Sequence, residues 1–208
     1  PDAERIGVVV ADVSGKGMPA AIYVHTMQGI IRASSTAARS PMDLLKQLQV
    51  HLGRSMEVSS FVTAVAAIFD LKKRTMEIAN AGHLPVFLKR KRTIRKVHPE
   101  GFVIGQVADE GFLEGLKSFR IQLRPGDVVL FFTDGVVESF NEKGEEFGFR
   151  RLERQAASFA GTARHIVEQC FRSVDQFAAE VPQSDDITVV AVKVLNERGR
   201  AHETHPDH

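Results

Sequence analysis

Strand-like segments of this sequence are grouped in a block instead of alternating one by one with helices. An apolar, β-branched run at 6–11 precedes two helical patterns, and a series of strand patterns follows them. Two more helical patterns and a last apolar run at 187–195 complete the order. Grouped strands favour an α+β fold with largely antiparallel strands, in one sheet or two packed sheets, over a doubly wound parallel sheet.

Hydrophobic periodicity and turn residues place the individual elements. Strands are expected at 6–11, 61–69, 75–79, 85–88, 93–97, 119–123, 128–133 and 187–195. Helices are expected at 18–34, after an N-cap at Ser40, at 149–158 and at 163–179. We expect inward-facing side chains at Ile22, Met27, Ile30 and Ile31 of the first helix and at Leu44, Leu45, Leu48 and Leu52 of the second.

The composition is that of an ordinary globular domain, with 43% hydrophobic and 25% charged residues. A formal net charge of +1, from 27 basic and 26 acidic residues, provides no argument for nucleic-acid binding. The single cysteine, Cys170, excludes an internal disulfide and is consistent with a reducing, cytoplasmic compartment. We expect it to be an inert buried thiol. No apolar stretch is long enough to span a bilayer.

The domain organisation is predicted to be simple. We expect one domain over 1–195 and a disordered polar tail over 196–208. Because the chain opens on Pro1 and a strand pattern starts almost at once, we interpret it as a fragment of a longer protein.

Aspartates stand at the ends of three very apolar strand patterns. Asp12 follows the run at 6–11, Asp134 follows 128–133, and Asp185 and Asp186 precede 187–195. Antiparallel neighbours place the end of one strand beside the start of the next, so these carboxylates could meet at one edge. Clustered carboxylates are costly without a cation, and hard oxygen ligands suit Mg²⁺ or Mn²⁺. Taken singly, each aspartate has a simpler interpretation as a turn residue, which is also our prediction for Asp70.

The turn after the first strand adds a weaker indication. Ser14-Gly-Lys-Gly17 leads directly into a predicted helix, whose free N–H groups could attract an anion. The segment lacks the GxxxxGK[ST] pattern of a P-loop, which argues against a P-loop nucleotide enzyme. A plain connection between strand and helix is the ordinary alternative.

Four motifs resemble those of the SpoIIE/RsbU-like phosphatases, the bacterial branch of the PPM, or protein phosphatase 2C-like, family. They are Asp12-Val-Ser-Gly-Lys-Gly17 with Ala20-Ala21 behind it, Asn80-Ala-Gly-His83, Phe132-Thr-Asp-Gly-Val-Val-Glu138 and Ser184-Asp-Asp-Ile-Thr188. The motifs occur in the family's order and span nearly the whole chain, so together they are highly specific.

The resemblance implies an antiparallel β-sandwich flanked by helices, with two Mn²⁺ or Mg²⁺ ions between the sheets. It assigns Asp12 as the bridging ligand, the Val13 carbonyl as a ligand of one ion, and Asp134 and Asp185 as ligands of the other. Asp186 would be an auxiliary ligand or would support the ligands. The implied reaction is direct attack of metal-bound water on phosphoserine or phosphothreonine, without a phosphoenzyme.

Two departures from the family's pattern matter. An acidic GGDxxD-like motif on a preceding strand would lie upstream of Pro1, so we expect the first strand or strands of the sandwich to be missing. Asp2 and Glu4 do not match that motif. Ser14 stands where the eukaryotic branch has a general-acid histidine, and we assign no general acid.

Other polar groups have two interpretations each. His83 could be a metal ligand, but a histidine that orders its turn is favoured. The basic hairpin tip at 89–92 could steer an acidic partner, or it could simply be solvated. The same alternatives apply to a basic group at a helix start, namely Arg150, Arg151 and Arg154. The tail histidines could bind metal loosely, although a floppy tail is favoured for His202, His205 and His208.

The sequence therefore predicts a metal-dependent phosphoserine/phosphothreonine protein phosphatase. The resemblance implies a phosphorylated anti-anti-sigma substrate with a STAS fold, an upstream sensor or regulatory domain in the parent chain, and a homodimer as a plausible assembly. The alternative is a catalytically inactive or self-inhibited module of the same fold that docks a partner. No nucleic-acid partner and no membrane segment are expected.

Overall fold

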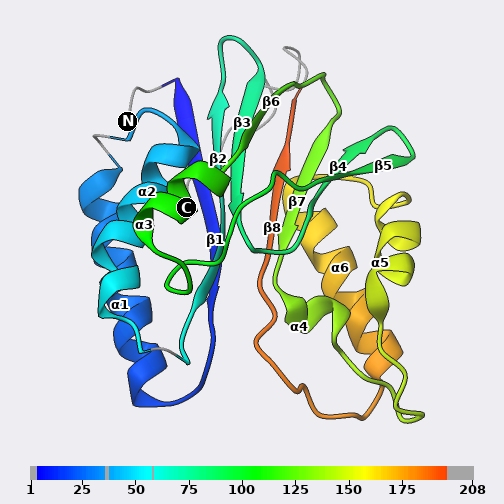
Figure 1. Ribbon diagram of the computed structural model, residues 1–208. Coiled ribbons are helices and arrows are strands. Elements are labelled where there is room, and N and C mark those ends of the chain that lie inside the picture. The colour runs from blue at the N-terminus through cyan, green and yellow to red at the C-terminus, as the bar shows by residue number, and fades with distance from the viewer. Residues whose placement is uncertain (1–3, 36–37, 58, 196–208) are drawn as a thin grey trace, which may run out of the picture. The chain divides into compact units, whose positions relative to one another are not determined.

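The computed structural model describes residues 4–35, 38–57 and 59–195 (Figure 1). The chain divides into two compact units. Unit 1 comprises Pro1–Leu84 and His98–Gln122, and unit 2 comprises Pro85–Val97 and Leu123–His208. The tail expected at 196–208 lies outside the described residues.

Unit 1 contains a four-stranded sheet in the order β1-β2-β3-β6, in which all pairings are antiparallel. Its strands are β1 (Arg5–Val13), β2 (Val62–Asp70), β3 (Thr75–Ala81) and β6 (Ser118–Gln122). The turn between β2 and β3 is closed by the Asp70 carboxylate, which accepts a hydrogen bond from the Lys73 N–H at 2.8 Å. This bond lowers the pKa of Asp70, which is a turn residue as predicted.

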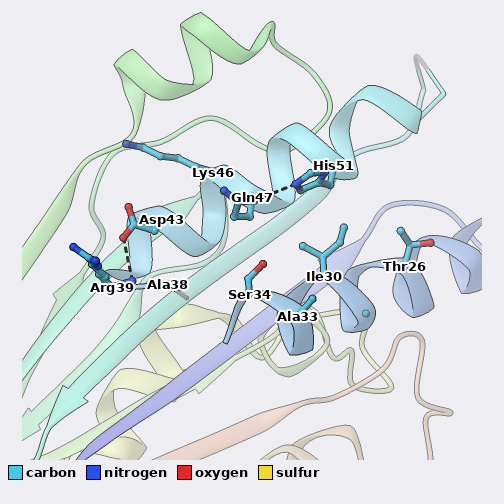
Figure 2. Close-up of a pocket in the computed structure, with 11 residues that line it drawn as sticks. Thr26, Ile30, Ala33, Ser34, Ala38, Arg39, Asp43, Lys46, Gln47 and His51 are labelled. Atoms are coloured by element: carbon cyan, nitrogen blue, oxygen red, sulfur yellow. Dashed lines mark hydrogen bonds between the residues drawn. The ribbon is translucent and has the colours of Figure 1, made fainter. Parts of the chain in front are cut away.

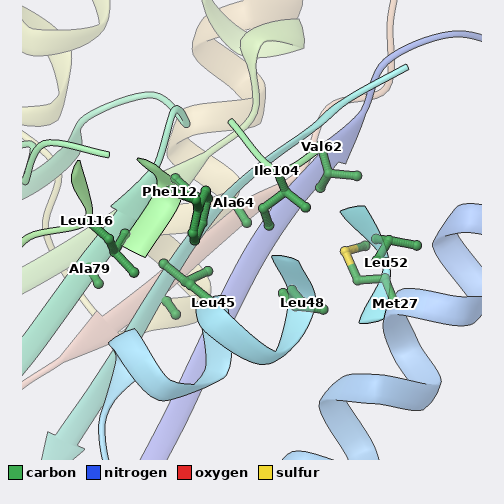
Figure 3. Packing of buried hydrophobic residues seen from close by; sticks show 12 residues of the cluster. Met27, Leu45, Leu48, Leu52, Val62, Ala64, Ala79, Ile104, Phe112 and Leu116 are labelled. Atoms are coloured by element: carbon green, nitrogen blue, oxygen red, sulfur yellow. The ribbon is translucent and has the colours of Figure 1, made fainter. Parts of the chain in front are cut away.

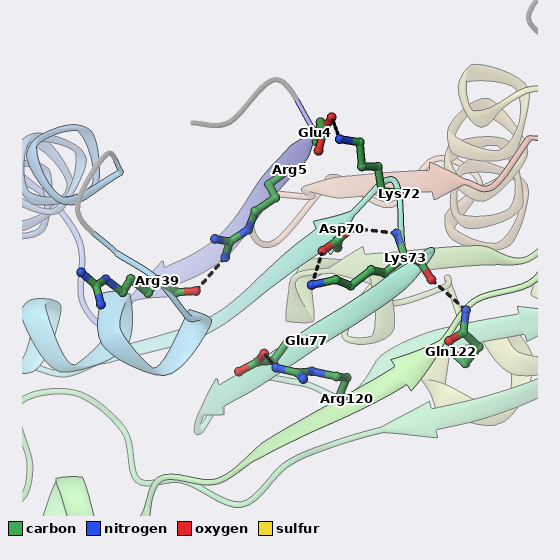
Figure 4. A network of polar contacts seen from close by, with 9 residues as sticks. All are labelled: Glu4, Arg5, Arg39, Asp70, Lys72, Lys73, Glu77, Arg120 and Gln122. Carbon is green, nitrogen blue, oxygen red and sulfur yellow. Dashed lines mark hydrogen bonds and ion pairs between the residues drawn. The ribbon is translucent and has the colours of Figure 1, made fainter.

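Polar contacts connect strands and loops of unit 1 (Figure 4). Arg120 on β6 and Glu77 on β3 are cross-strand partners, and their side chains pair at 2.7 Å. The Arg5 guanidinium donates to the Arg39 carbonyl at 2.6 Å, and the Gln122 amide donates to the Lys73 carbonyl at 3.0 Å. Exposed ion pairs contribute only about 0–1 kcal/mol, so the stability of this unit depends mainly on its apolar core.

The core of unit 1 forms where helices cover the sheet (Figure 1). The helices are α1 (Met18–Ser34), α2 (Pro41–His51), the 3₁₀ turn η1 (Gly53–Ser55) and α3 (Asp109–Gly115). A capping box starts α2, because the Ser40 side chain and the Asp43 side chain each bond the other's backbone N–H. The buried cluster in Figure 3 is aliphatic apart from one phenylalanine: Met27, Leu45, Leu48, Leu52, Val62, Ala64, Ala66, Ala79, Ala81, Ile104, Phe112 and Leu116.

The inward face predicted for α2 is largely confirmed, and that of α1 needs a correction. Leu45, Leu48 and Leu52 are fully buried, as expected. Ile22 is 55% exposed, so its predicted inward position is wrong, whereas Met27 is buried. In α1 the apolar residues are spread around the helix, and their spacing alone does not say which side packs on β1.

Unit 2 contains a second four-stranded antiparallel sheet, in the order β5-β4-β7-β8. Its strands are β4 (Val86–Arg90), β5 (Thr93–Val97), β7 (Val128–Phe132) and β8 (Val189–Lys193). Every residue of β7 is buried, as predicted for a central strand. A buried carboxylate, Asp127, is paired with Arg90 at 2.7 Å at the start of this strand.

Helices α4 (Asp134–Val137), α5 (Gly148–Ala156) and α6 (Ala163–Ala178) complete unit 2. Its core combines valine and leucine side chains with several phenylalanines, and the rings of Phe87 and Phe132 meet edge to face at 5.0 Å. Cys170 on α6 is 1% exposed, and burial raises the pKa of its thiol to about 12. The expectation of an inert buried thiol is therefore confirmed.

The α+β class with antiparallel strands is confirmed, and every predicted strand and helix is present. The helix at 18–34 and the strand at 93–97 have the predicted ends, and most of the other elements have shifted ends. The last strand is shorter than expected, since β8 covers Val189–Lys193 only. Three short elements were not predicted, namely α3, α4 and η1, because each spans too few residues to show a period. Among the described residues, no helix combines the length and apolar character needed to cross a membrane.

Candidate metal centre

In unit 1 the backbone ladder of the sheet positions Asp12 and Val13. Asp12 pairs with Thr63 of β2 and Val13 pairs with Val62, so both belong to β1. The expected end of the first strand at residue 11 is therefore too early. The strand continues because its pairing with β2 extends to Val13.

Directly after β1, Ser14 makes two hydrogen bonds to the backbone of Phe61, the residue before β2. The Ser14 N–H donates to the Phe61 carbonyl at 2.9 Å, and the Ser14 hydroxyl accepts from the Phe61 N–H at 2.7 Å. Gly15 and Gly17 then adopt φ values of +95° and +81°, a region that L side chains rarely occupy. The serine thus has a structural role here, and no side chain caps the start of α1.

A buried turn supports the strand beside Asp12. The Asn80 amide oxygen accepts from the His83 N–H at 2.7 Å, and its NH₂ group donates to the His83 carbonyl at 3.0 Å. The His83 ring is hydrogen bonded to the Thr63 hydroxyl at 2.8 Å, and Thr63 is the cross-strand partner of Asp12. These bonds support the interpretation of His83 as a residue that orders its turn.

In unit 2 Asp134 stands two residues after the end of β7, where this strand end is hydrogen bonded to the segment that leads into β8. The Thr133 hydroxyl accepts from the Thr188 N–H at 2.9 Å and donates to the Asp186 carbonyl at 3.1 Å. The Asp134 carboxylate accepts from the Gly135 N–H at 2.9 Å. Asp134 therefore begins α4 in a fixed backbone position, and its side chain is half-buried.

The segment before β8 packs closely on this turn. A Cβ added at Gly135 would lie 2.5 Å from the Asp186 carbonyl oxygen and 3.3 Å from that of Asp185. The Asp185 carboxylate accepts from the Asp186 N–H at 2.8 Å, and both side chains are exposed. Glycine is thus required at 135 so that the two strand ends can approach each other.

A third carboxyl group, that of Glu138, has a raised pKa, and neighbouring negative charges in unit 2 contribute to the rise. Partial removal from water raises the pKa of the Glu138 carboxyl. Negative charges on Asp134, Glu146 and Asp185 raise it further. Glu138 was not predicted as a site residue, although its place four positions after Asp134 was the available signal.

Unit 2 therefore brings together two of the three predicted aspartates, Asp134 and Asp185. Asp12 belongs to the other sheet, so a single sheet edge does not carry all three. In the described part of the chain, no group of three or more His, Cys, Asp or Glu side chains is placed to hold a metal ion. The donor types nevertheless suit a hard divalent cation, because the predicted ligands are carboxylate and carbonyl oxygens, and Asp134 and Asp185 make no ion pair with another described residue.

Unit 1 also contains a hollow, and none of the predicted ligands Asp12, Asp134 and Asp185 lines it. It has a volume of about 790 Å³ and lies between α1 and α2 (Figure 2). Two pairs of its polar residues are hydrogen bonded, since the Arg39 N–H donates to the Asp43 carboxylate at 3.2 Å and the His51 ring bonds the Gln47 amide oxygen at 3.0 Å. The hollow is therefore separate from the candidate metal centre.

Comparison with solved structures identifies the class of fold. The structure matches the SiaA PP2C domain of Pseudomonas aeruginosa with a TM-score of 0.81 and 22% identity, over 93% of this chain and 76% of that one. It also matches RsbX in complex with magnesium, with a TM-score of 0.64 and 14% identity, over 92% of this chain and 82% of that one. The fold is that of PP2C-type phosphatase domains.

Sequence comparison then identifies the family. The model of the family described as Stage II sporulation protein E (SpoIIE) matches residues 2–195. The chain therefore belongs to the SpoIIE family. It is also similar to phosphoserine phosphatase RsbU of Bacillus subtilis (strain 168), with 26% identity over 196 residues. That match covers 92% of this chain and 56% of RsbU, so the chain spans about half the length of this relative.

Proposed function

We propose that this chain is the catalytic domain of a divalent-metal-dependent phosphoserine/phosphothreonine protein phosphatase. The observation that carries the proposal is the junction of β7 and β8 in unit 2, where Thr133 bonds Asp186 and Thr188 and the backbone of Asp185 and Asp186 packs against Gly135, the residue after Asp134. Family membership and the PP2C-type fold support it. RsbU, named a phosphoserine phosphatase, and the magnesium complex of RsbX support the reaction and the cofactor class.

The proposed ligands of two Mn²⁺ or Mg²⁺ ions are the predicted ones. Asp12 would bridge the ions, the Val13 carbonyl would bind one, and Asp134 and Asp185 would bind the other. Asp134 and Asp185 make no ion pair with another described residue, so no cation of the protein in that part of the chain neutralises them. Hard carboxylate and carbonyl oxygens are the donors that both ions prefer.

The residues of this chain would contribute to the proposed reaction by holding the metal ligands in fixed positions. Bound divalent ions would supply Lewis-acid polarisation of the phosphoryl group and a lowered pKa for water. Thr133 and Gly135 hold Asp134 next to Asp185, and the β1–β2 ladder holds Asp12 and the Val13 carbonyl. The negative charges of Asp134 and Asp185 contribute to the raised pKa of Glu138. Groups fixed before the reaction need no reorganisation during it.

The proposed substrate is a phosphorylated protein, and the resemblance to the SpoIIE/RsbU-like family favours an anti-anti-sigma protein with a STAS fold. An upstream sensor or regulatory domain and a homodimer are further proposals for the parent protein.

The test combines metal binding with turnover. Mn²⁺ binding is measured by calorimetry and hydrolysis of p-nitrophenyl phosphate with and without Mn²⁺, for this chain and for a form extended upstream. We expect Asp134→Asn to weaken Mn²⁺ binding and to reduce turnover by about a hundredfold or more. The exposed Glu168→Gln on α6 removes the same charge from unit 2 and serves as the matched control.

Each outcome decides between the two functions. Metal-dependent turnover that Asp134→Asn abolishes and Glu168→Gln preserves supports the phosphatase. Absence of p-nitrophenyl phosphate turnover from both forms of the chain, with and without Mn²⁺, would contradict it. The protein would then be a docking module of the same fold.

A further inference from the structure

A small cavity in unit 2 is lined by one aromatic ring and three arginines. Its volume is about 220 Å³, and its lining residues are Phe147, Arg150, Arg151 and Arg154. All four come from α5 and the residue before it, so a single helical stretch builds the cavity. None of the lining residues is a carboxylate, and the lining therefore carries only positive charge.

Arg151 is held in place without losing its charge. Its Nη1 donates to the carbonyls of Glu146 and Phe147 at 2.7 and 2.8 Å. Its guanidinium lies over the Phe177 ring, 4.2 Å from the centroid, and Phe177 packs edge to face on Phe147 at 5.4 Å. Neutral carbonyls and an aromatic face orient a guanidinium, but they do not neutralise it.

Arg150 and Arg154 are exposed and lie four positions apart, on the same face of α5. Like charges at this spacing repel each other and destabilise a helix. Neither side chain makes a hydrogen bond or ion pair with another residue in the described part of unit 2. The carboxylate of Glu153, the residue before Arg154, pairs with Lys96 of β5 at 2.8 Å.

We propose that this cavity binds one oxyanion, a phosphate or carboxylate group carried by a protein partner. Guanidinium groups recognise both oxyanions through paired N–H donors, and clusters of arginine are a recurring mode of binding phosphorylated or acidic protein segments. The volume suits a single such group and falls below the range of about 300–1,000 Å³ that is usual for drug-sized ligands and cofactors. The proposal does not depend on the phosphatase function, because none of the candidate metal ligands takes part.

The test uses the full chain, labelled with ¹⁵N, in EDTA and about 0.15 M salt so that no metal-dependent reaction occurs and diffuse attraction is screened. The Arg Nε–Hε resonances are followed during titration with inorganic phosphate and with three versions of one peptide, carrying phosphoserine, glutamate or serine. We expect the phosphoserine peptide, the glutamate peptide or both to shift Arg150, Arg151 and Arg154. The serine peptide should not shift them. Whichever peptide binds more tightly identifies the oxyanion.

A matched pair of variants makes the test specific. Arg150→Gln with Arg154→Gln should raise the Kd by about tenfold or more, because two charge-assisted contacts are lost. Arg164→Gln with Arg172→Gln removes the same charge from exposed positions of α6 and should change the Kd by less than about twofold. Thermal melts of both variants confirm that they fold.

Three results would overturn the proposal. Equal weakening by both double variants would show diffuse attraction to a basic surface. Binding of inorganic phosphate without binding of either charged peptide would exclude a protein-borne group. Absence of any shift at the three arginines would exclude the site.

Discussion

The two units hold their aspartates by different means. In unit 1 Asp12 lies within a regular strand, and main-chain pairing with β2 positions it. In unit 2 Asp134 lies just beyond a strand, and a threonine hydroxyl, a glycine and the segment before β8 position it. Backbone pairing between β1 and β2 is compatible with many side chains. The junction of β7 and β8 in unit 2 instead needs a hydroxyl at position 133 and a glycine at position 135. Substitutions around Asp134 should therefore be more harmful than equivalent ones around Asp12.

The cores of the two units also differ. The cluster in unit 1 is built from alanine, leucine and other aliphatic side chains (Figure 3). Unit 2 packs aromatic rings edge to face, with Phe87 against Phe132 and Phe147 against Phe177. Small residues let helices lie close to the sheet, and large rings fill more space with fewer side chains.

The largest effect is expected from truncation in these cores. Phe87→Ala removes a fully buried ring and its contact with Phe132, and it should reduce the free energy of unfolding by about 3–5 kcal/mol. Leu48→Ala in unit 1 should cost about 2–5 kcal/mol. Denaturant titration measures both. A loss below 1 kcal/mol for Phe87→Ala would show that the aromatic core is not tightly packed.

A second pair compares glycines of the two units that both have positive φ. Gly82 has φ +71°, and an added Cβ would lie 2.3 Å from the Val103 side chain. Gly82→Ala should therefore reduce stability by about 2–4 kcal/mol. Gly126 has φ +87° with nothing within 4 Å, so Gly126→Ala should cost only about 1–2 kcal/mol. Thermal melts that rank Gly126→Ala as the more harmful change would contradict the packing around Gly82.

The threonines beside the aspartates test the comparison most directly. Thr133→Val keeps the shape but removes the bonds to Thr188 and Asp186, so we expect a loss of about 1–3 kcal/mol in stability. We also expect Mn²⁺ affinity to fall by about ten- to a hundredfold, because the change disturbs a residue that orients Asp134. Thr63→Val loses only the bond to His83 and should have the smaller effect on affinity. If calorimetric titration shows that Thr133→Val and Thr63→Val lower the Mn²⁺ affinity equally, the proposed difference between the two units is refuted.

The smallest expected effect concerns pH. Hydrogen bonds from Gln49 and Arg54, at 3.0 and 2.8 Å, lower the pKa of the Asp109 carboxyl in unit 1. Since the folded pKa lies below the ordinary value of 3.8, the stabilisation is present above that value and is lost as the pH falls through the folded pKa.

The measurement compares the free energy of unfolding of Asp109→Asn and the parent chain as the pH is lowered. The stability difference between them should shrink as the pH falls below about 4. Asp175→Asn on α6, an exposed carboxylate with no ion pair among the described residues, is the control and should show no such trend. A difference that stays constant with pH would refute the expectation.

Much of the fold could be predicted from the sequence because periodicity and turn chemistry are local. The runs that became β7 and β8, the N-cap at Ser40 and the turn at Asp70 depend on residues within a few positions of one another. The aspartates at the strand ends were visible for the same reason. The exposure of Ile22 could not be predicted, since several faces of α1 carry apolar residues.

Local patterns in the sequence located the longer strands and helices, favoured the antiparallel class and showed which acidic residues stand at strand ends. The pairing of β7 with β8, the bond from Thr133 to a residue 53 positions away, and the effect of Asp134 and Asp185 on the pKa of Glu138 are visible only in the folded chain. The two kinds of feature depend on residues at different separations along the chain. Periodicity depends on neighbours along the chain, whereas these contacts depend on which distant strands pair.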